Sequence, residues 1–330
     1  MNDRLKKILR LVLSAALAVV LLYFCFRGVS WSEFLNVLGQ CRWSLVLGAM
    51  LCGVFAYMLR SLRWKLMLDP FDRSIPLLSC YDGFTIGKVA DYAVPHVGEF
   101  VRCMYVVTPK ATYDKVLGTV VLDRVWDVFM LGILLLVTLF FKWEDFGAFF
   151  MERIVSPASS RLDMSLWWVL AVVMVLAASA VWMLFAFRTR NKFCSKVYDG
   201  MKGIFQGVAG IVRMDGKLLF ILYTAGLWFM FLLMSWFTIR ALPADYGLNL
   251  MDAMFIMLLG SIAGIVPVPG GFGAFHYLIA IALQTLYGIP FGMGLIFATL
   301  SHESQAVTTF IVGAVSYARQ AFFKKKVTNK

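Results

Sequence analysis

The stretch VPVPGGFG, residues 266–273, places two prolines and three glycines between two long apolar runs. Proline lacks a backbone donor and glycine weakens a helix, so the stretch is predicted to interrupt the helix around it. Backbone that leaves a helix at membrane depth must be buried in protein or line a wet cavity, because lipid offers no hydrogen-bond partners. Broken helices of this kind usually build binding sites in membrane proteins.

The composition is that of an integral membrane protein. Of the 330 residues, 61% are hydrophobic and 15% are charged, whereas soluble domains contain about 45–50% apolar and about 25% charged residues. A helical span needs about 20 residues, so the chain suits several spans with short loops. We expect one membrane domain over residues 1–330 and no soluble catalytic domain.

The net charge of +12 arises from basic residues that gather at the ends of apolar segments. This distribution follows the positive-inside rule and argues against nucleic-acid binding. With the N-terminus in the cytoplasm, it predicts a multi-pass protein of the cytoplasmic membrane with both termini inside. The clusters are Arg4, Lys6, Lys7 and Arg10; Arg60, Arg63 and Lys65; Arg188, Arg190 and Lys192; and Arg319, Lys324, Lys325 and Lys326.

Hydropathy predicts six full transmembrane helices and two interrupted segments, which we interpret as re-entrant helical hairpins. The predicted hairpins are residues 77–107 and 251–286, and two short amphipathic helices are expected near residues 31–40 and 194–212. The order span, span, hairpin, span occurs twice with opposite orientation, so residues 1–142 and 164–330 are predicted to be an inverted repeat, a recurring plan of transporters. The predicted spans are residues 9–26, 43–66, 116–141, 166–187, 218–239 and 291–315.

The first hairpin carries charged residues at membrane depth, where each costs roughly 2.5–3.5 kcal/mol on insertion scales. Glu99 and Arg102 lie one helical turn apart, so they can pair, or Arg102 can face an anionic headgroup. The polar and helix-breaking residues of this segment are Asp91, Pro95, His96, Gly98, Glu99 and Arg102.

The third predicted span begins with two carboxylates on one helical face, Asp123 and Asp127. Such a pair repels unless a cation lies between its members, which calls for Arg124, Arg102 or a cationic substrate. Two interpretations remain open, a structural ion-pair network and the wall of a polar cavity.

All three histidines fall at broken or polar sites, namely His96, His276 and His302, the last of which precedes Glu303. A lone membrane histidine is usually a packing residue, but three such placements predict a shared wet cavity, and titration near pH 6.5 suits a proton relay. Zinc ligation fits the residue types, but no H-x-x-H or C-x-x-C spacing supports it. We therefore expect no metal and no cofactor.

Three motifs resemble those of one family, the lysylphosphatidylglycerol synthase transmembrane-region family, also called flippase-like domain proteins. Residues 87–102 resemble its G-x-x-x-N-x-x-L-P-x-R-x-G-E-x-x-R segment. Residues 123–127 are similar to its E-R-x-x-D, and residues 267–273 match its P-x-P-G-G-x-G. The resemblance covers essentially the whole chain.

Five positions depart from the family pattern and redistribute charge around the expected cavity. The aminoacyl-lipid substrate of the best-known members therefore does not transfer directly to this chain. The departures are Asp91 for Asn, His96 for Arg, Asp123 for Glu, His276 for Glu and His302 for Arg.

We expect a flippase or translocase, not an enzyme, that moves a polar or charged lipid between leaflets. Candidate lipids are an aminoacyl-phospholipid, a glycolipid and a polyprenyl-linked sugar, and no Walker A pattern indicates direct use of ATP. One half of the expected cavity contains Glu99, Arg102, Asp123, Arg124 and Asp127. The other half contains Pro267, Pro269, Gly270, Gly271, Gly273, His276, His302 and Glu303.

Two alternatives belong to other functional classes. One is a membrane-embedded transferase or hydrolase for a lipid-linked substrate, with His276 or His302 as base and Asp123, Asp127 or Glu99 as acid. The other is an accessory subunit of a separate lipid-synthesis enzyme.

Overall fold

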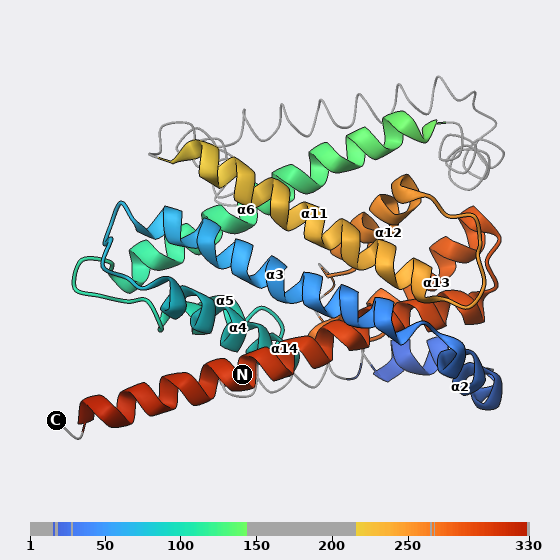
Figure 1. Cartoon of the computed structure of the whole chain (residues 1–330), viewed down its shortest axis with the longest axis horizontal. Coiled ribbons are helices and arrows are strands. Elements are labelled where there is room, and N and C mark those ends of the chain that lie inside the picture. Colours follow the sequence, from blue (N-terminus) through green and yellow to red (C-terminus); the bar gives the residue numbers. More distant parts are fainter. Residues whose placement is uncertain are drawn as a thin grey trace, which may run out of the picture. The chain divides into compact units, whose positions relative to one another are not determined.

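The computed structural model describes residues 16, 19–27, 29–143, 216–264, 266 and 268–328, and every regular element in these ranges is helical (Figure 1). The prediction of an all-α protein is confirmed for this part of the chain. The chain forms two compact units, Met1–Asp123 with Leu218–Lys330, and Arg124–Lys217. The predicted span at 166–187, the helix at 194–212 and half of the first span lie outside the described residues.

Within the described residues, two helices are long and apolar enough to cross a membrane, α3 (Trp43–Leu68) and α11 (Lys217–Ala241). Their 26 and 25 residues correspond to about 38–39 Å of helix, more than the roughly 30 Å of a hydrocarbon core. They pack closely, since a Cβ at Gly48 would lie 3.3 Å from Phe237 and one at Gly226 would lie 3.2 Å from Leu59.

Two further predicted spans are helical, in α6 (Tyr113–Phe141) and α14 (Phe291–Thr328). The latter continues well beyond residue 315, where the predicted span ends. The short helix α2 (Trp31–Gln40) confirms the amphipathic helix predicted there, with Phe34 buried and Leu35 exposed. The number of full crossings and the inverted repeat stay predictions.

Both interrupted segments are broken where the sequence predicts. The first consists of α4 (Leu77–Ala93) and the short α5 (Gly98–Cys103), and the second of α12 (Leu250–Ala263), the 3₁₀ turn η2 (Pro269–Gly271) and α13 (Ala274–Tyr287). The longest of these helices has 17 residues and is about 26 Å long. None of the four reaches the roughly 30 Å needed for a full crossing.

The break in the second segment depends on glycine. Gly270, Gly271 and Gly273 have φ angles of 60°, 79° and 80°, a left-handed conformation that costs other residues about 1–2 kcal/mol each. The chain therefore leaves the helix at this point and re-enters it at α13. We call η2 with Phe272 and Gly273 the tip.

The break in the first segment is held closed by direct backbone packing between α4 and α5. A Cβ at Gly98 would lie 2.1 Å from the carbonyl oxygen of Gly87, and one at Gly83 would lie 2.8 Å from the carbonyl oxygen of Arg102. The Asp91 carboxylate accepts a hydrogen bond of 2.7 Å from the Gly98 backbone N–H. Glycine is required here because a side chain would separate the two helices.

The long helix α14 is fixed along α4 by polar contacts. Thr85 donates its hydroxyl hydrogen to Ser316 at 2.9 Å. The buried Asp82 carboxylate accepts from Arg319 Nε at 3.1 Å and from Gln320 at 2.7 Å. Arg319, predicted only as part of a basic terminus, thus also has a structural role.

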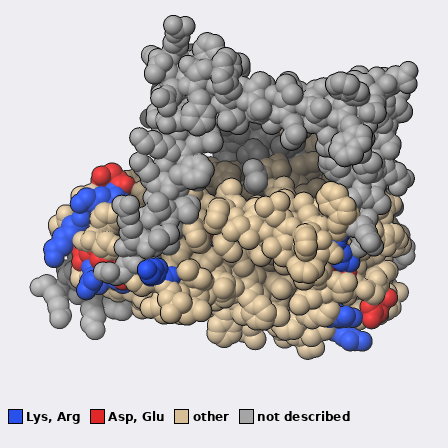
Figure 2. All heavy atoms as spheres, turned by 90° about the horizontal axis from the view of Figure 1, so that it is seen from above, with Lys and Arg blue, Asp and Glu red and all other residues tan. Residues whose placement is uncertain are grey.

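The outer faces of the apolar helices are hydrophobic. Leu47, Leu51 and Phe55 follow one another at four-residue spacing on α3 and are all exposed. In the face that Figure 2 shows, Lys, Arg, Asp and Glu gather toward opposite ends of the described part, and other residues cover the surface between them. An exposed apolar surface of this extent is typical of contact with lipid.

Candidate functional site

The first compact unit contains two polar clusters. The arginine cluster consists of Arg60, Arg63, Glu99, Arg102 and Asp123. The histidine cluster consists of His276, His302 and Glu303. Both are built from residues on different helices, and together they contain eight charged or titratable groups from the predicted cavity and its surroundings.

Asp123 is the centre of the arginine cluster. Its carboxylate is fully buried and accepts hydrogen bonds from Arg63 on one oxygen and from Arg60 and Arg102 on the other, at 3.3 Å and 3.4 Å for the latter two. A buried carboxylate is tolerated when it is paired and hydrogen-bonded, as this one is. The structure thus confirms Arg102 as a partner of Asp123.

Arg102 connects the first interrupted segment to this centre. Its Nε lies 2.9 Å from Glu99 Oε2, which confirms the predicted pair on α5. Its guanidinium group also lies over the Trp64 ring, 4.7 Å from the centroid, a cation–π arrangement. Trp64 donates its ring N–H to Thr119 at 2.9 Å. Arg102 therefore links α5 to α3 through Trp64 and to the start of α6 through Asp123.

Sequence reasoning missed Arg60 and Arg63 as members of this cluster. Both were assigned to a basic end of the second span, but α3 continues to Leu68 and both guanidinium groups are buried against Asp123. The sequence does contain one indication of this role, because Arg60 and Arg63 lie one helical turn apart and inside the helix rather than after it. A basic pair at that depth calls for an acidic partner.

The other predicted acidic residue of this span pairs locally. In the second compact unit, Arg124 Nη1 lies 3.9 Å from Asp127 Oδ2, and the Arg124 side chain is 40% exposed. Asp123 pairs with Arg60, Arg63 and Arg102, whereas Asp127 lies near Arg124.

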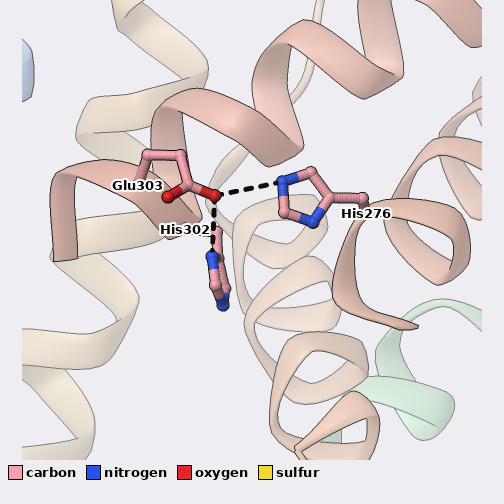
Figure 3. Close-up of side chains that lie close together, drawn as sticks. All are labelled: His276, His302 and Glu303. Atoms are coloured by element: carbon pink, nitrogen blue, oxygen red, sulfur yellow. Dashed lines mark hydrogen bonds and ion pairs between the residues drawn. The ribbon is translucent and has the colours of Figure 1, made fainter. Parts of the chain in front are cut away.

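The histidine cluster places one carboxylate oxygen between two imidazole rings (Figure 3). Glu303 Oε1 lies 3.1 Å from His302 Nδ1 and 3.4 Å from His276 Nε2. His302 Nε2 lies 2.8 Å from the Gly270 carbonyl oxygen. The cluster therefore joins α13, α14 and the tip.

The environment of the histidine cluster is aromatic on one side and open on the other. Phe275 lies 5.3 Å from the His302 ring and 6.2 Å from the His276 ring, between centroids. His276 is 1% exposed, whereas the Glu303 side chain is 41% exposed. The carboxylate can thus be reached while its histidine partners are held by packing.

The end of the first interrupted segment contacts the tip of the second. The rings of Tyr92 and Phe272 lie edge to face at 6.0 Å, and a Cβ at Gly270 would lie 2.6 Å from Tyr92 Cδ1. Two segments that are far apart in the sequence therefore meet at their breaks.

The remaining predicted site residues are Pro95, His96, Pro267 and Pro269. Pro95 and His96 lie in the turn between α4 and α5, where His96 is exposed with a φ angle of 61° and makes no hydrogen bond or ion pair within the described ranges. The structure brings His276 and His302 together but does not bring His96 to them. Pro269 begins η2, and Pro267 lies outside the described residues.

Apolar helices, two interrupted segments and buried ion pairs define a helical membrane protein. The chain belongs to the lysylphosphatidylglycerol synthase TM region family, whose model matches residues 8–313. This membership confirms the resemblance of the three motifs and indicates a lipid-related function in a membrane. No curated protein and no solved structure matches this chain.

Proposed function

We propose that this protein is a flippase or translocase that moves a lipid with a polar or charged headgroup between leaflets. The observation that carries the proposal is the contact between Tyr92 and the tip at Phe272 and Gly270. Transporter sites are commonly built where discontinuous helices from two parts of the chain meet. Family membership supports the lipid as the cargo.

The two polar clusters support a substrate with a charged headgroup. Buried arginines with a planar fork bind phosphate and carboxylate groups well, and the accessible carboxylate of Glu303 suits a cationic or hydroxylated group. We therefore retain an aminoacyl-phospholipid, a glycolipid and a polyprenyl-linked sugar as candidate lipids. The proposed location is the cytoplasmic membrane, with both termini on the cytoplasmic side and a separate enzyme as the source of the lipid.

A leaflet-exchange measurement tests this proposal. The purified chain is reconstituted into liposomes that contain headgroup-labelled analogues of each lipid class, and a membrane-impermeant quencher is added outside. In protein-free liposomes the labelled lipid of the inner leaflet, half of the total, is protected from the quencher. We expect this protected fraction to be smaller for one lipid class when the protein is present. Protection at the protein-free level for every class would contradict the proposal.

The histidine cluster favours one alternative, a membrane-embedded transferase or hydrolase. An imidazole beside a carboxylate is a common general base, and His302 lies 3.1 Å from Glu303. Extraction of the same liposomes distinguishes the two functions. A modified lipid in the extract would indicate an enzyme, whereas exchange of an unmodified lipid supports the flippase.

The tip is expected to be sensitive to side chains. In Gly271→Leu the left-handed φ of 79° becomes strained, and the new side chain begins 3.5 Å from His302 Nε2. If this strain of about 1–2 kcal/mol adds to the activation free energy of transport, exchange becomes roughly tenfold slower. We expect this loss in the liposome measurement, with the protein still folded.

Gly292→Leu is the matched control for the tip variant. Gly292 lies in α14, and a Cβ there would meet no atom within 4 Å. This variant should exchange lipid at the wild-type rate. Equal rates in both variants would show that the tip is a connecting loop with no part in transport.

A further inference from the structure

We propose that His276, His302 and Glu303 form a binding site for a divalent transition-metal ion of the zinc type. The three potential ligand atoms are His276 Nε2, His302 Nδ1 and one Glu303 oxygen, and all lie within 4.8 Å of one another. Two imidazoles and a carboxylate are the ligand set of a recurring class of zinc sites. This inference is independent of lipid transport.

The hydrogen bond from His302 to the tip determines which ring nitrogen is available. A carbonyl oxygen only accepts hydrogen bonds, so His302 Nε2 must carry the hydrogen that it donates to Gly270 at 2.8 Å. In the neutral ring, Nδ1 then presents a lone pair toward Glu303 Oε1 at 3.1 Å. A lone pair and a carboxylate at this distance repel unless a proton or a cation lies between them.

A metal ion between these donors would remove the repulsion. With bonds of about 2.0–2.1 Å, neighbouring ligands of a tetrahedral zinc ion are separated by about 3.3–3.4 Å. The observed separations of Glu303 Oε1 from the two ring nitrogens are 3.1 Å and 3.4 Å. The donors are thus already placed along two edges of such a tetrahedron.

The surroundings of the three residues have two further features of metal sites. Metal-bound histidines usually donate their second ring N–H to a carbonyl or carboxylate, as His302 does to Gly270. His276 is 1% exposed, and its Nδ1 has no hydrogen-bond partner among the described residues. A strong ligand bond at the other ring nitrogen would offset the cost of burying this polar ring.

The site would leave one coordination position open. Three protein ligands with a free fourth position are typical of zinc sites that bind water or a substrate oxygen. The 41% exposure of the Glu303 side chain places this position on the accessible side of the cluster. Sequence reasoning did not favour a metal because the two histidines are 26 positions apart and show no local spacing.

Direct metal binding to the full-length chain tests the proposal. The detergent-purified protein is stripped with a chelator, and Zn²⁺ is titrated in competition with a chromophoric chelator. We expect one Zn²⁺ per chain and, with Co²⁺, the intense visible absorption of a tetrahedral site. Mg²⁺ should not compete, because it prefers oxygen ligands in octahedral geometry.

Three variants and one control assign the ion to these residues. His302→Gln, His276→Gln and Glu303→Gln should each weaken Zn²⁺ binding by more than about 100-fold, since loss of a mere supporting partner already costs 10–100-fold. His96→Gln removes the exposed histidine of the first segment and should bind as the wild type does. Zn²⁺ should raise the Tm of the wild type and of His96→Gln but of none of the other three.

Two results would overturn the proposal. One is wild-type protein that binds no Zn²⁺ above a protein-free detergent control and shows no tetrahedral Co²⁺ spectrum, a measurement that needs no variant to fold. The other is unchanged binding in folded His302→Gln and Glu303→Gln, which would indicate an adventitious ion only.

Discussion

Asp123→Asn is expected to destabilise the protein more than any other single charge change. The fully buried Asp123 carboxylate accepts hydrogen bonds from Arg60, Arg63 and Arg102. Removing one side of a buried ion pair costs about 3–5 kcal/mol because the remaining charge is left uncompensated. We expect a large fall in Tm in detergent and little folded protein in membranes.

Asp245→Asn is the matched control for this substitution. The Asp245 carboxylate lies 3.2 Å from Arg240, but its side chain is 73% exposed. Exposed pairs contribute about 0–1 kcal/mol, so its Tm should be close to that of the wild type. If instead Asp123→Asn keeps the wild-type Tm and loses only lipid exchange, the arginine cluster is a hydrated wall of the substrate path rather than a structural centre.

The interruptions of the helices could be predicted from the sequence because they depend on local chemistry. Proline and glycine act on their own backbone, so the breaks at residues 94–97 and at the tip follow from residues within a few positions. The Glu99–Arg102 pair is equally local, since one helical turn joins its members. The family motifs at residues 87–102 and 267–273 indicate the same two segments.

The pairing of distant charges could not be predicted in this way. Arg60 and Arg63 are 63 and 60 positions from Asp123, and at the sequence level their charge fitted the positive-inside rule equally well. Only the contacts of both side chains with Asp123 in the folded chain show that they are buried partners. The same holds for His276 and Glu303, which meet because α13 folds back along α14.

The histidines show that residue type alone does not define a site. All three lie at broken or polar positions, which predicted one shared cavity. His276 and His302 meet in the histidine cluster, whereas His96 lies exposed in the turn between α4 and α5. His96 has a φ angle of 61°. This backbone conformation of the turn cannot be predicted from the spacing of residues in the sequence.

Gly98→Ala is expected to have the largest effect of any methyl group added to the described part of the chain. The new Cβ would lie 2.1 Å from the Gly87 carbonyl oxygen and 2.7 Å from Asp91 Oδ1. Neither backbone nor the capping carboxylate can move without breaking the bond from Gly98 to Asp91. Overpacking of this kind lowers the free energy of unfolding by about 3 kcal/mol, the upper end of the usual range.

The effect of Gly98→Ala should extend to the arginine cluster. Arg102 lies on the same short helix, so moving α5 away from α4 also moves the guanidinium group that contacts Asp123 and Trp64. We therefore expect a lower Tm and loss of lipid exchange together, measured on the same preparation.

Gly118→Ala is a control that should change the stability in the opposite direction. Gly118 lies within α6, and a Cβ there would meet no atom within 4 Å. Alanine is favoured over glycine in a helix by up to about 1 kcal/mol, so this variant should be as stable as the wild type or more stable. A Gly98→Ala protein that is stabilised to the same extent would show that α4 and α5 do not pack backbone to backbone. The inference that this packing positions Arg102 against the buried Asp123 would then be wrong.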